Sequence, residues 1–109
     1  MSPFMFIGID HMPHSMALRE QHRAEHRRYM FDNNLDLVWV SIMEDEAGNQ
    51  CGTTYVFNVE GEQDVWRWLK EEPFWKAGVY SSCKVVRCNI ALNRHPMTEW
   101  IVPQAKGLS

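Results

Sequence analysis

The sequence predicts a single α+β domain whose elements follow the order β-α-β-β-α-β. Three observations predict it. Runs rich in β-branched and aromatic residues occur at four places, a long stretch without Gly or Pro separates the first two runs, and an amphipathic stretch separates the last two. The length of 109 residues suits one hydrophobic core, and the hydrophobic fraction of 45% supplies material for it.

The first strand and the first helix occupy the N-terminal third of the chain. Residues 4–10, FMFIGID, form an apolar run that closes at Asp10. A helix is expected from Ser15, a suitable N-cap, to Asn33, because this stretch is dense in Ala, Leu, Met, Arg and Glu. The cluster of Asp and Asn residues at its end stops it.

A β-hairpin is expected next. Residues 35–43 and residues 53–59 both have the composition of strands, and the polar, turn-rich residues 44–52 connect them. A second helix is expected over residues 62–72, because Val65, Trp68 and Leu69 recur at i, i+3 and i+4 on one stripe of that segment.

Pro73 ends this second helix, since proline cannot continue the hydrogen-bond ladder. One further helical turn over residues 73–78 leads to a fourth strand over residues 79–92. The whole is the ferredoxin-like arrangement, an antiparallel four-stranded sheet with two helices on one face. The other face carries aromatic residues and is expected to find a partner. We assign residues 1–92 to the domain and residues 93–109 to a tail or an arm that docks on a neighbouring subunit.

Composition disfavours several classes of function. A formal charge of −3 gives no general attraction to phosphate backbones. Tyr55 and Phe57 share one strand face but lack the basic and glycine neighbours of an RNA-binding sheet, so no nucleic-acid partner is expected. No apolar run is long enough to span a membrane and no signal peptide is recognised, so we expect no membrane partner and a cytoplasmic location. Three scattered cysteines fit a reducing compartment.

The segment HRAEH, residues 22–26, places two histidines on one face of the first helix, with Glu25 between them. A zinc hydrolase needs a third protein ligand, and the remaining histidines lie in predicted loops or in the tail. They are His11, His14 and His95. A structural metal site drawn from these histidines stays open as an alternative, but we expect neither a metal nor a cofactor.

A buried histidine beside a carboxylate is the second interpretation of this face. Helical spacing predicts that the inward face combines apolar and titratable groups, with Arg19 and Met30 on its flank. The residues of this predicted face are Leu18, His22, His26, Tyr29 and Asn33. A neutral imidazole can accept or give a proton near pH 7, and the candidate carboxylate partners are Asp10 and Glu72.

Several short motifs together resemble the YciI-like, or YCII-related, proteins. They are Arg19-Glu20-Gln21-His22, Gly52-Thr53, Trp68, Glu72-Pro73-Phe74 and Ala77-Gly78-Val79-Tyr80. The likeness spans about residues 4 to 90. It implies a dimeric α+β barrel, in which two subunits join their open sheet faces, with a homodimer or a higher oligomer as the assembly. It also implies a small pocket between the first helix and the sheet.

The resemblance implies a His–carboxylate site in which His22 is the base and Glu72 stands where the family has Asp. Arg19 would bind an anionic group, with Phe74 and His26 as further contacts to the ligand. Ser41 belongs to a segment that lines the pocket in the family, but the family usually has Gly there. This exchange and the longer Glu72 both put the pocket geometry in question.

The function that the resemblance implies is a cofactor-free lyase or isomerase. It would transfer a proton on a small anionic or aromatic-degradation metabolite, as a dehydrochlorinase or a muconolactone isomerase does. The alternative is a non-catalytic, small-molecule-binding or accessory protein that uses the same pocket. The sequence leaves the choice between them open.

Overall fold

The computed structural model describes residues 1–89, and the expected tail, residues 93–109, lies outside them. The strands and helices run in the order β1 Ser2–Asp10, α1 His14–Asp32, β2 Leu37–Glu44, β3 Gln50–Val59, α2 Glu62–Lys70, α3 Pro73–Lys76 and β4 Tyr80–Arg87. This is the predicted β-α-β-β-α-β order, with the expected extra helical turn as α3. The fourth strand was predicted to continue to residue 92, but it ends at Arg87.

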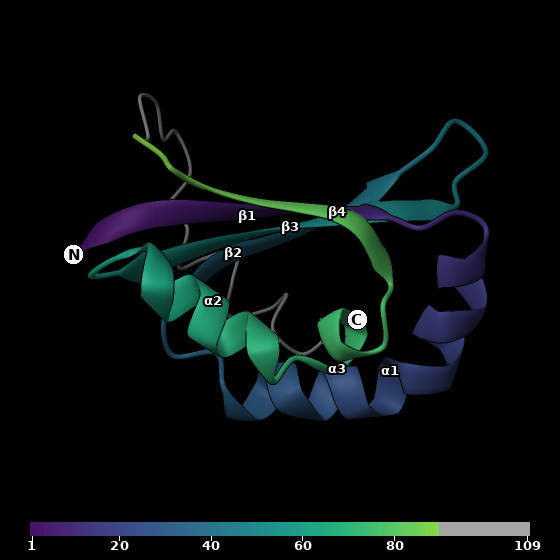
Figure 1. Cartoon of the computed structure of the whole chain (residues 1–109), viewed down its shortest axis with the longest axis horizontal. Coiled ribbons are helices and arrows are strands. Elements are labelled where there is room, and N and C mark those ends of the chain that lie inside the picture. Colours follow the sequence, from purple (N-terminus) through teal and green to yellow (C-terminus); the bar gives the residue numbers. More distant parts are fainter. Residues whose placement is uncertain (90–109) are drawn as a thin grey trace.

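The four strands form one antiparallel sheet in the order β2-β3-β1-β4. All three helices lie on one face of this sheet (Figure 1). β1 and β3 are the central strands, and β1 pairs with both β3 and β4. The predicted ferredoxin-like fold is therefore confirmed. Among residues 1–89, no helix is both long and apolar enough to cross a membrane.

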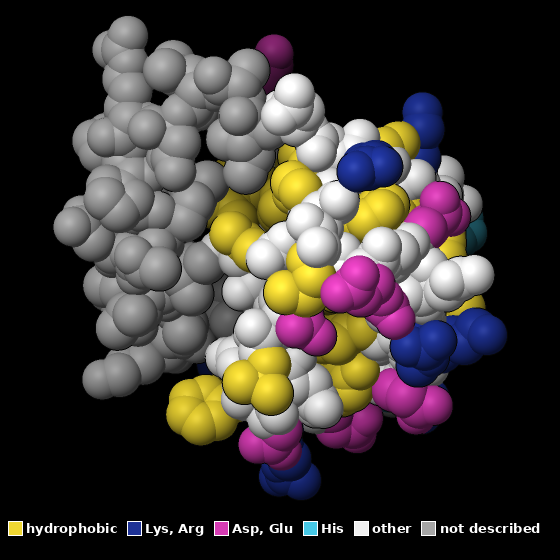
Figure 2. Space-filling model, turned by 90° about the vertical axis from the view of Figure 1, so that its left-hand side faces the viewer, with side chains coloured by type: hydrophobic (Ala, Val, Ile, Leu, Met, Phe, Trp, Pro, Cys, Tyr) yellow, Lys and Arg dark blue, Asp and Glu magenta, His cyan; other side chains and the backbone are white. Residues whose placement is uncertain are grey.

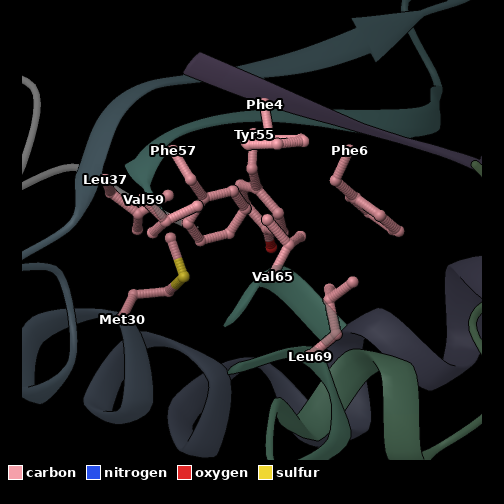
Figure 3. Close-up of a cluster of buried hydrophobic side chains, with 9 residues drawn as sticks. All are labelled: Phe4, Phe6, Met30, Leu37, Tyr55, Phe57, Val59, Val65 and Leu69. Carbon is pink, nitrogen blue, oxygen red and sulfur yellow. The ribbon is translucent and has the colours of Figure 1, made fainter. Parts of the chain in front are cut away.

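The core fills the space between the sheet and the helices (Figure 3). Side chains from alternating positions of β1 and β3 meet apolar side chains of α1 and α2 there. The cluster consists of Phe4, Phe6, Met30, Leu37, Tyr55, Phe57, Val59, Val65 and Leu69. The predicted stripe of the second helix faces the core, because Val65 and Leu69 are fully buried and Trp68 is partly buried against the core.

The helix boundaries differ from the expected ones in two informative places. Ser15 was expected to cap α1, but the helix begins at His14, and the Ser15 hydroxyl is directed to the sulfur of Met12. The second helix was expected to run to residue 72, but α2 ends at Lys70. Glu72 is instead the N-cap of the short helix α3, which has Pro73 in its first turn, and the Glu72 side chain accepts hydrogen bonds from backbone N–H groups. A residue expected to act in a pocket thus also holds a helix terminus.

Candidate functional site

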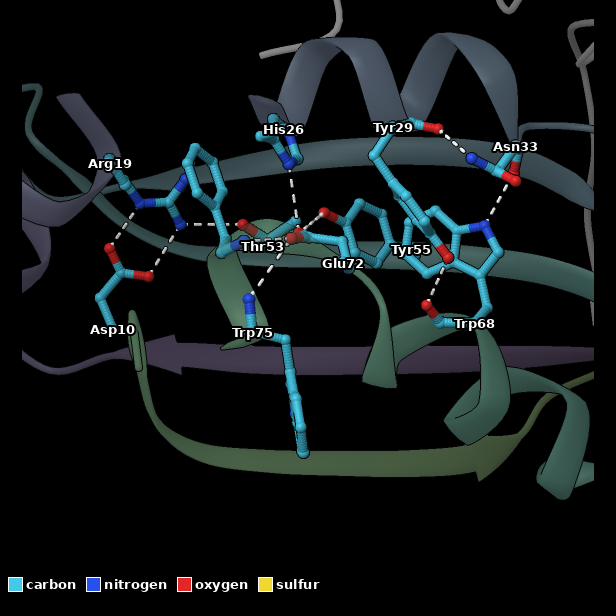
Figure 4. Close-up of polar contacts among 11 residues, drawn as sticks. Asp10, Arg19, His26, Tyr29, Asn33, Thr53, Tyr55, Trp68, Glu72 and Trp75 are labelled. Carbon is cyan, nitrogen blue, oxygen red and sulfur yellow. Dashed lines mark hydrogen bonds and ion pairs between the residues drawn. The ribbon is translucent and has the colours of Figure 1, made fainter. Parts of the chain in front are cut away.

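A cluster of buried polar side chains lies between α1, α3 and the sheet (Figure 4). The face of α1 that is buried consists of Ser15, Arg19, His26 and Met30. The face predicted to point inward was centred on His22. In the structure, the inward face is instead centred between His26 and Arg19, on the side where Arg19 and Met30 were expected to flank it. It presents an arginine and a histidine to the interior, and both have partners there.

Arg19 forms a bidentate ion pair with Asp10 at the end of β1. Its Nε lies 2.7 Å from Asp10 Oδ2 and its Nη2 lies 2.8 Å from Asp10 Oδ1. The same Nη2 donates to Thr53 Oγ1 at 2.9 Å, and the guanidinium lies over the ring of Phe74. Burial alone would lower the pKa of Arg19, but the Asp10 hydrogen bonds and charge raise it, so the arginine stays charged. Asp10 thus already balances the charge that was expected to bind a substrate anion.

His26 forms the second buried pair, with Glu72. Its Nδ1 lies 3.1 Å from Glu72 Oε1, and the side chains are 2% and 0% exposed. The imidazole stacks on Phe74 with ring centroids 3.9 Å apart and an interplanar angle of 8°. Because Phe74 contacts both His26 and the guanidinium of Arg19, its ring joins the two buried pairs.

Glu72 is held by donors on both of its oxygens. Oε1 accepts from the Tyr55 hydroxyl at 3.1 Å as well as contacting His26, and Oε2 accepts from the backbone N–H of Phe74 and, at 3.3 Å, of Trp75. Such a set of donors favours the ionised carboxylate. An ionised carboxylate can only accept, so the hydrogen in the contact belongs to His26 Nδ1. Nε2 is then the imidazole nitrogen with a free lone pair, and no described residue donates to it.

The expected pairing of His22 with Glu72 is wrong, because His26 makes that contact. The His22 side chain is 26% exposed, and its Nδ1 lies 3.7 Å from Glu25 Oε2 on the same helix. The rotation of α1 that brings Arg19 to Asp10 turns position 26 inward and leaves position 22 at the edge of the buried face. The catalytic role of His22 stays a prediction.

Two predicted ligand contacts end up on different faces of the sheet. Phe74 is 1% exposed inside the cluster. Ser41 pairs with Thr54 in the β2–β3 register, and Thr54 alternates with Thr53 and Tyr55, which point toward the helices. Ser41 therefore lies on the opposite face, away from Arg19, His26 and Glu72.

Sequence reasoning overlooked the polar contribution of β3. Thr53 was noted only as part of a motif, and Tyr55 only as an aromatic residue on one strand face, yet each contacts one of the buried pairs. Their spacing of two on one strand placed them on the same sheet face and was the available signal. Asp10 was considered as a partner for histidine, but it pairs with Arg19.

Burial raises the pKa of tyrosines around the cluster. The pKa of Tyr55 rises well above its ordinary value, first because of burial and then because of the charges of Tyr80 and Glu72. The pKa of Tyr80 also rises, chiefly because of burial, with the Glu72 charge next. Both hydroxyls therefore keep their protons and act as donors at neutral pH.

Outside the buried polar cluster, residues 1–89 hold a cavity but no candidate metal site. These residues contain no group of three or more His, Cys, Asp and Glu side chains that could hold a metal. A cavity of about 370 Å³ lies beside the start of β1 and is lined by Met1, Asp36, Val59, Glu60, Asp64, Arg67 and Trp68. Hydrophobic side chains lie between acidic and basic ones on that end of the molecule (Figure 2). The cavity lining includes neither of the buried ion pairs.

Comparison with solved structures supports the fold. The 5-chloro-2-hydroxyhydroquinone dehydrochlorinase TftG from Burkholderia phenoliruptrix AC1100, in complex with 2,5-dihydroxybenzoquinone, matches with a TM-score of 0.70 and 20% identity. The match covers 80% of this chain and 93% of that one. A structure of PA3566 from Pseudomonas aeruginosa matches with a TM-score of 0.49 and 12% identity, over 84% of this chain and 97% of that one.

No curated protein matches the chain. The family model of the YCII-related domain matches residues 4–89, which include every strand and helix of the structure. The chain therefore belongs to the YCII-related domain family.

Proposed function

We propose that the protein acts on a small molecule by proton transfer, with His26 as the base and Glu72 as the group that orients it. The observation that carries the proposal is the buried contact of 3.1 Å between His26 Nδ1 and Glu72 Oε1. It fixes the tautomer, leaves Nε2 to accept a proton, and places a negative charge beside the imidazolium that would form. His22, one helical turn away, is the rival base.

The chemistry balances without a cofactor. His26 Nε2 takes a proton from an O–H or C–H group of the substrate. Returning that proton to another substrate atom is an isomerisation. If an anionic group instead leaves with the electrons of its bond, the reaction is an elimination, and the proton departs as acid.

We propose a small oxygenated ring compound as the substrate class. TftG, which has the same fold, is a dehydrochlorinase of a chlorinated hydroxyhydroquinone and binds a dihydroxyquinone. In this chain the aromatic ring of Phe74 and the hydroxyls of Tyr55 and Tyr80 lie around the His26–Glu72 pair. Rings and hydroxyl donors suit a flat ligand that carries oxygen atoms.

A second candidate is ligand binding without turnover. Two observations favour it: Asp10 already neutralises Arg19, and Glu72 is occupied by four donors, two of them backbone groups that cap α3. In this version both pairs stabilise the fold around a binding site.

The experiment that separates the candidates is an assay of purified protein with 5-chloro-2-hydroxyhydroquinone, followed by chloride release. Catalysis by His26 predicts turnover in the wild type, a loss of about 100-fold or more in His26→Gln, and nearly full activity in His22→Gln. If the compound raises the melting temperature and is recovered unchanged, binding without chemistry is correct. If His22→Gln alone is inactive, the base is His22.

We also propose that two copies of the chain pair through the open sheet face. Side chains of Met5, Ile7, Trp39 and Val56 lie on this face, opposite the helices. Light scattering should give about twice the chain mass of 12.8 kDa for the wild type. Ile7→Glu should give the single-chain mass, and a wild-type monomer at micromolar concentration would contradict the pairing.

The reaction is proposed to take place in the cytoplasm. Cys51, Cys83 and Cys88 are all free thiols in the structure. Free thiols at partly buried positions suit a reducing compartment.

A further inference from the structure

The Tyr80 side chain lies beside the two buried pairs, Arg19–Asp10 and His26–Glu72. It is the first residue of β4 and pairs with Asp10 in the register of β1 and β4. Its ring meets the ring of Phe6 edge-on at 5.5 Å, and the Arg19 guanidinium lies 5.9 Å from the ring centroid. Gly78, with φ of +81°, makes the turn that starts the strand at this point.

Gly8 makes room for this ring. A Cβ atom at position 8 would lie 2.8 Å from Tyr80 Cδ1 and 2.8 Å from Phe6 Cζ. Atoms do not approach so closely without movement, so the absence of a side chain at Gly8 leaves room for the Tyr80 ring beside β1. The hydroxyl is thereby directed into the polar cluster.

The Tyr80 hydroxyl differs from the other polar groups of the cluster. Among the described residues it is the one buried side-chain nitrogen or oxygen without a hydrogen-bond partner. Thr53 and Tyr55 are its polar neighbours, and their hydrogen bonds go to other groups: Thr53 Oγ1 accepts from Arg19, and the Tyr55 hydroxyl donates to Glu72. Buried hydroxyls in proteins are nearly always paired, so an unpaired one inside a polar cluster calls for a partner that the described residues do not supply.

The protonation state of Tyr80 sets the kind of ligand atom it can bind. Burial, and after it the negative charge of Glu72, raises the pKa of Tyr80, so the hydroxyl remains a donor throughout the physiological pH range. The unpaired hydroxyl donor of Tyr80 needs an acceptor atom as its partner. Carbonyl, enolate and phenolate oxygens of a small ring compound are acceptors of this kind.

We propose that the Tyr80 hydroxyl is a ligand-binding group of the site and donates a hydrogen bond to a carbonyl or phenolate oxygen of the substrate. This inference rests on the proposed function, because it names a second contact at the same site. Tyr80 holds the oxygen on which negative charge develops, while His26 takes the proton. Phe74 contacts both His26 and Arg19, so its ring links the base to the guanidinium beside Tyr80.

The test measures the affinity of 2,5-dihydroxybenzoquinone by calorimetry. The variants are Tyr80→Phe, which removes only the hydroxyl, and Gly8→Ala, which displaces the ring. The matched control is Tyr29→Phe, since the Tyr29 hydroxyl donates to the Trp68 carbonyl at 2.6 Å, outside the cluster. We expect Kd to rise about tenfold or more in Tyr80→Phe and in Gly8→Ala, and to stay within about twofold in Tyr29→Phe.

The melting temperatures of the variants distinguish a ligand-binding role of Tyr80 from a structural one. Tyr80→Phe should leave the melting temperature unchanged or raise it, because it removes an unpaired buried hydroxyl, whereas Tyr29→Phe should lower it. An unchanged Kd in Tyr80→Phe, or a wild type that does not bind the quinone, overturns the inference. A tenfold weaker Kd in Tyr80→Phe together with full turnover in His26→Gln would support Tyr80 and overturn only the role of His26.

Discussion

His26 Nδ1 lies 3.1 Å from Glu72 Oε1, and the second oxygen of the same carboxylate caps the helix that begins at Pro73. The carboxylate therefore orients the imidazole and fixes the start of α3 at once. Phe74, the residue after the proline, then stacks on His26. A change at Glu72 should affect both the histidine and the position of Phe74.

Replacing the two histidines should have very different effects on stability. His26→Ala removes a buried ring that is stacked and hydrogen-bonded, and we expect a loss of about 2–4 kcal/mol in the free energy of unfolding. His22→Ala, at the partly exposed edge of α1, should change it by less than about 0.5 kcal/mol. Urea unfolding of both variants measures the difference, and equal losses would mean that the two rings are equally buried.

Glu72→Gln tests whether the carboxylate stabilises the fold through its contacts with His26, Tyr55 and the backbone of α3. The amide oxygen of Gln can still accept from the backbone of α3, but the amide carries no charge, and its NH2 group, which only donates, cannot accept from Tyr55 or from His26. We expect a loss of about 1–3 kcal/mol and a His26 ring that no longer has a fixed tautomer. Glu71→Gln, on the exposed neighbouring residue, is the control and should be close to neutral. Equal stabilities of the two variants would show that the hydrogen bonds of the Glu72 carboxylate do not stabilise the fold.

The Arg19–Asp10 pair should show strong coupling in a double-mutant cycle. Arg19→Met or Asp10→Asn alone leaves a buried polar group without its partner and should cost about 3–5 kcal/mol. The double variant should lose clearly less than the sum of the two single losses, because neither charge remains alone. Additive losses in thermal unfolding would show that the two side chains do not pair in solution.

Alkaline pH should unfold the protein through its tyrosines. All three tyrosines of the chain have a raised pKa: Tyr29 to about 12, and Tyr55 and Tyr80 more strongly, in each case first because of burial. A raised pKa contributes stability that is complete below the unfolded value of 10.0 and is lost as the pH rises through the folded value. Each of the two buried tyrosines should steepen the fall by about 1.4 kcal/mol per pH unit above pH ~10.

Absorbance at about 295 nm follows this titration. We expect no tyrosine ionisation at pH 10 in the folded protein and a cooperative step at higher pH that coincides with loss of structure. The urea-unfolded chain, which titrates near the ordinary value, is the control. Ionisation near pH 10 with the fold intact would contradict the buried placement of Tyr55 and Tyr80.

The sequence predicted the fold well because each element has a clear local signal. The apolar, β-branched and aromatic composition of β1 and β3 predicts strands, and the apolar stripe of α2 predicts a helix with one buried face. Glu72 was correctly expected to lie beside a histidine of the first helix. These features depend on short-range pattern.

The choice between His22 and His26 depended on long-range contacts. The two positions lie about 40° apart on a helix, which is less than the error in predicting which direction faces inward. Arg19 decided the outcome, because its ion pair with Asp10 turns the helix and places a charged residue in the interior. Sequence patterns assign arginine to the surface, since an unpaired arginine is almost never buried.

The most direct test of the account is a nitrogen-15 NMR measurement of the histidine rings of the folded protein. We predict that His26, when neutral, carries its proton on Nδ1, that this proton is protected from exchange with water, and that Glu72→Gln abolishes the protection. The ring of His22, which is 26% exposed, should exchange quickly. A His26 ring protonated on Nε2, or one that exchanges as fast as His22, would contradict the buried pair and with it the proposed base.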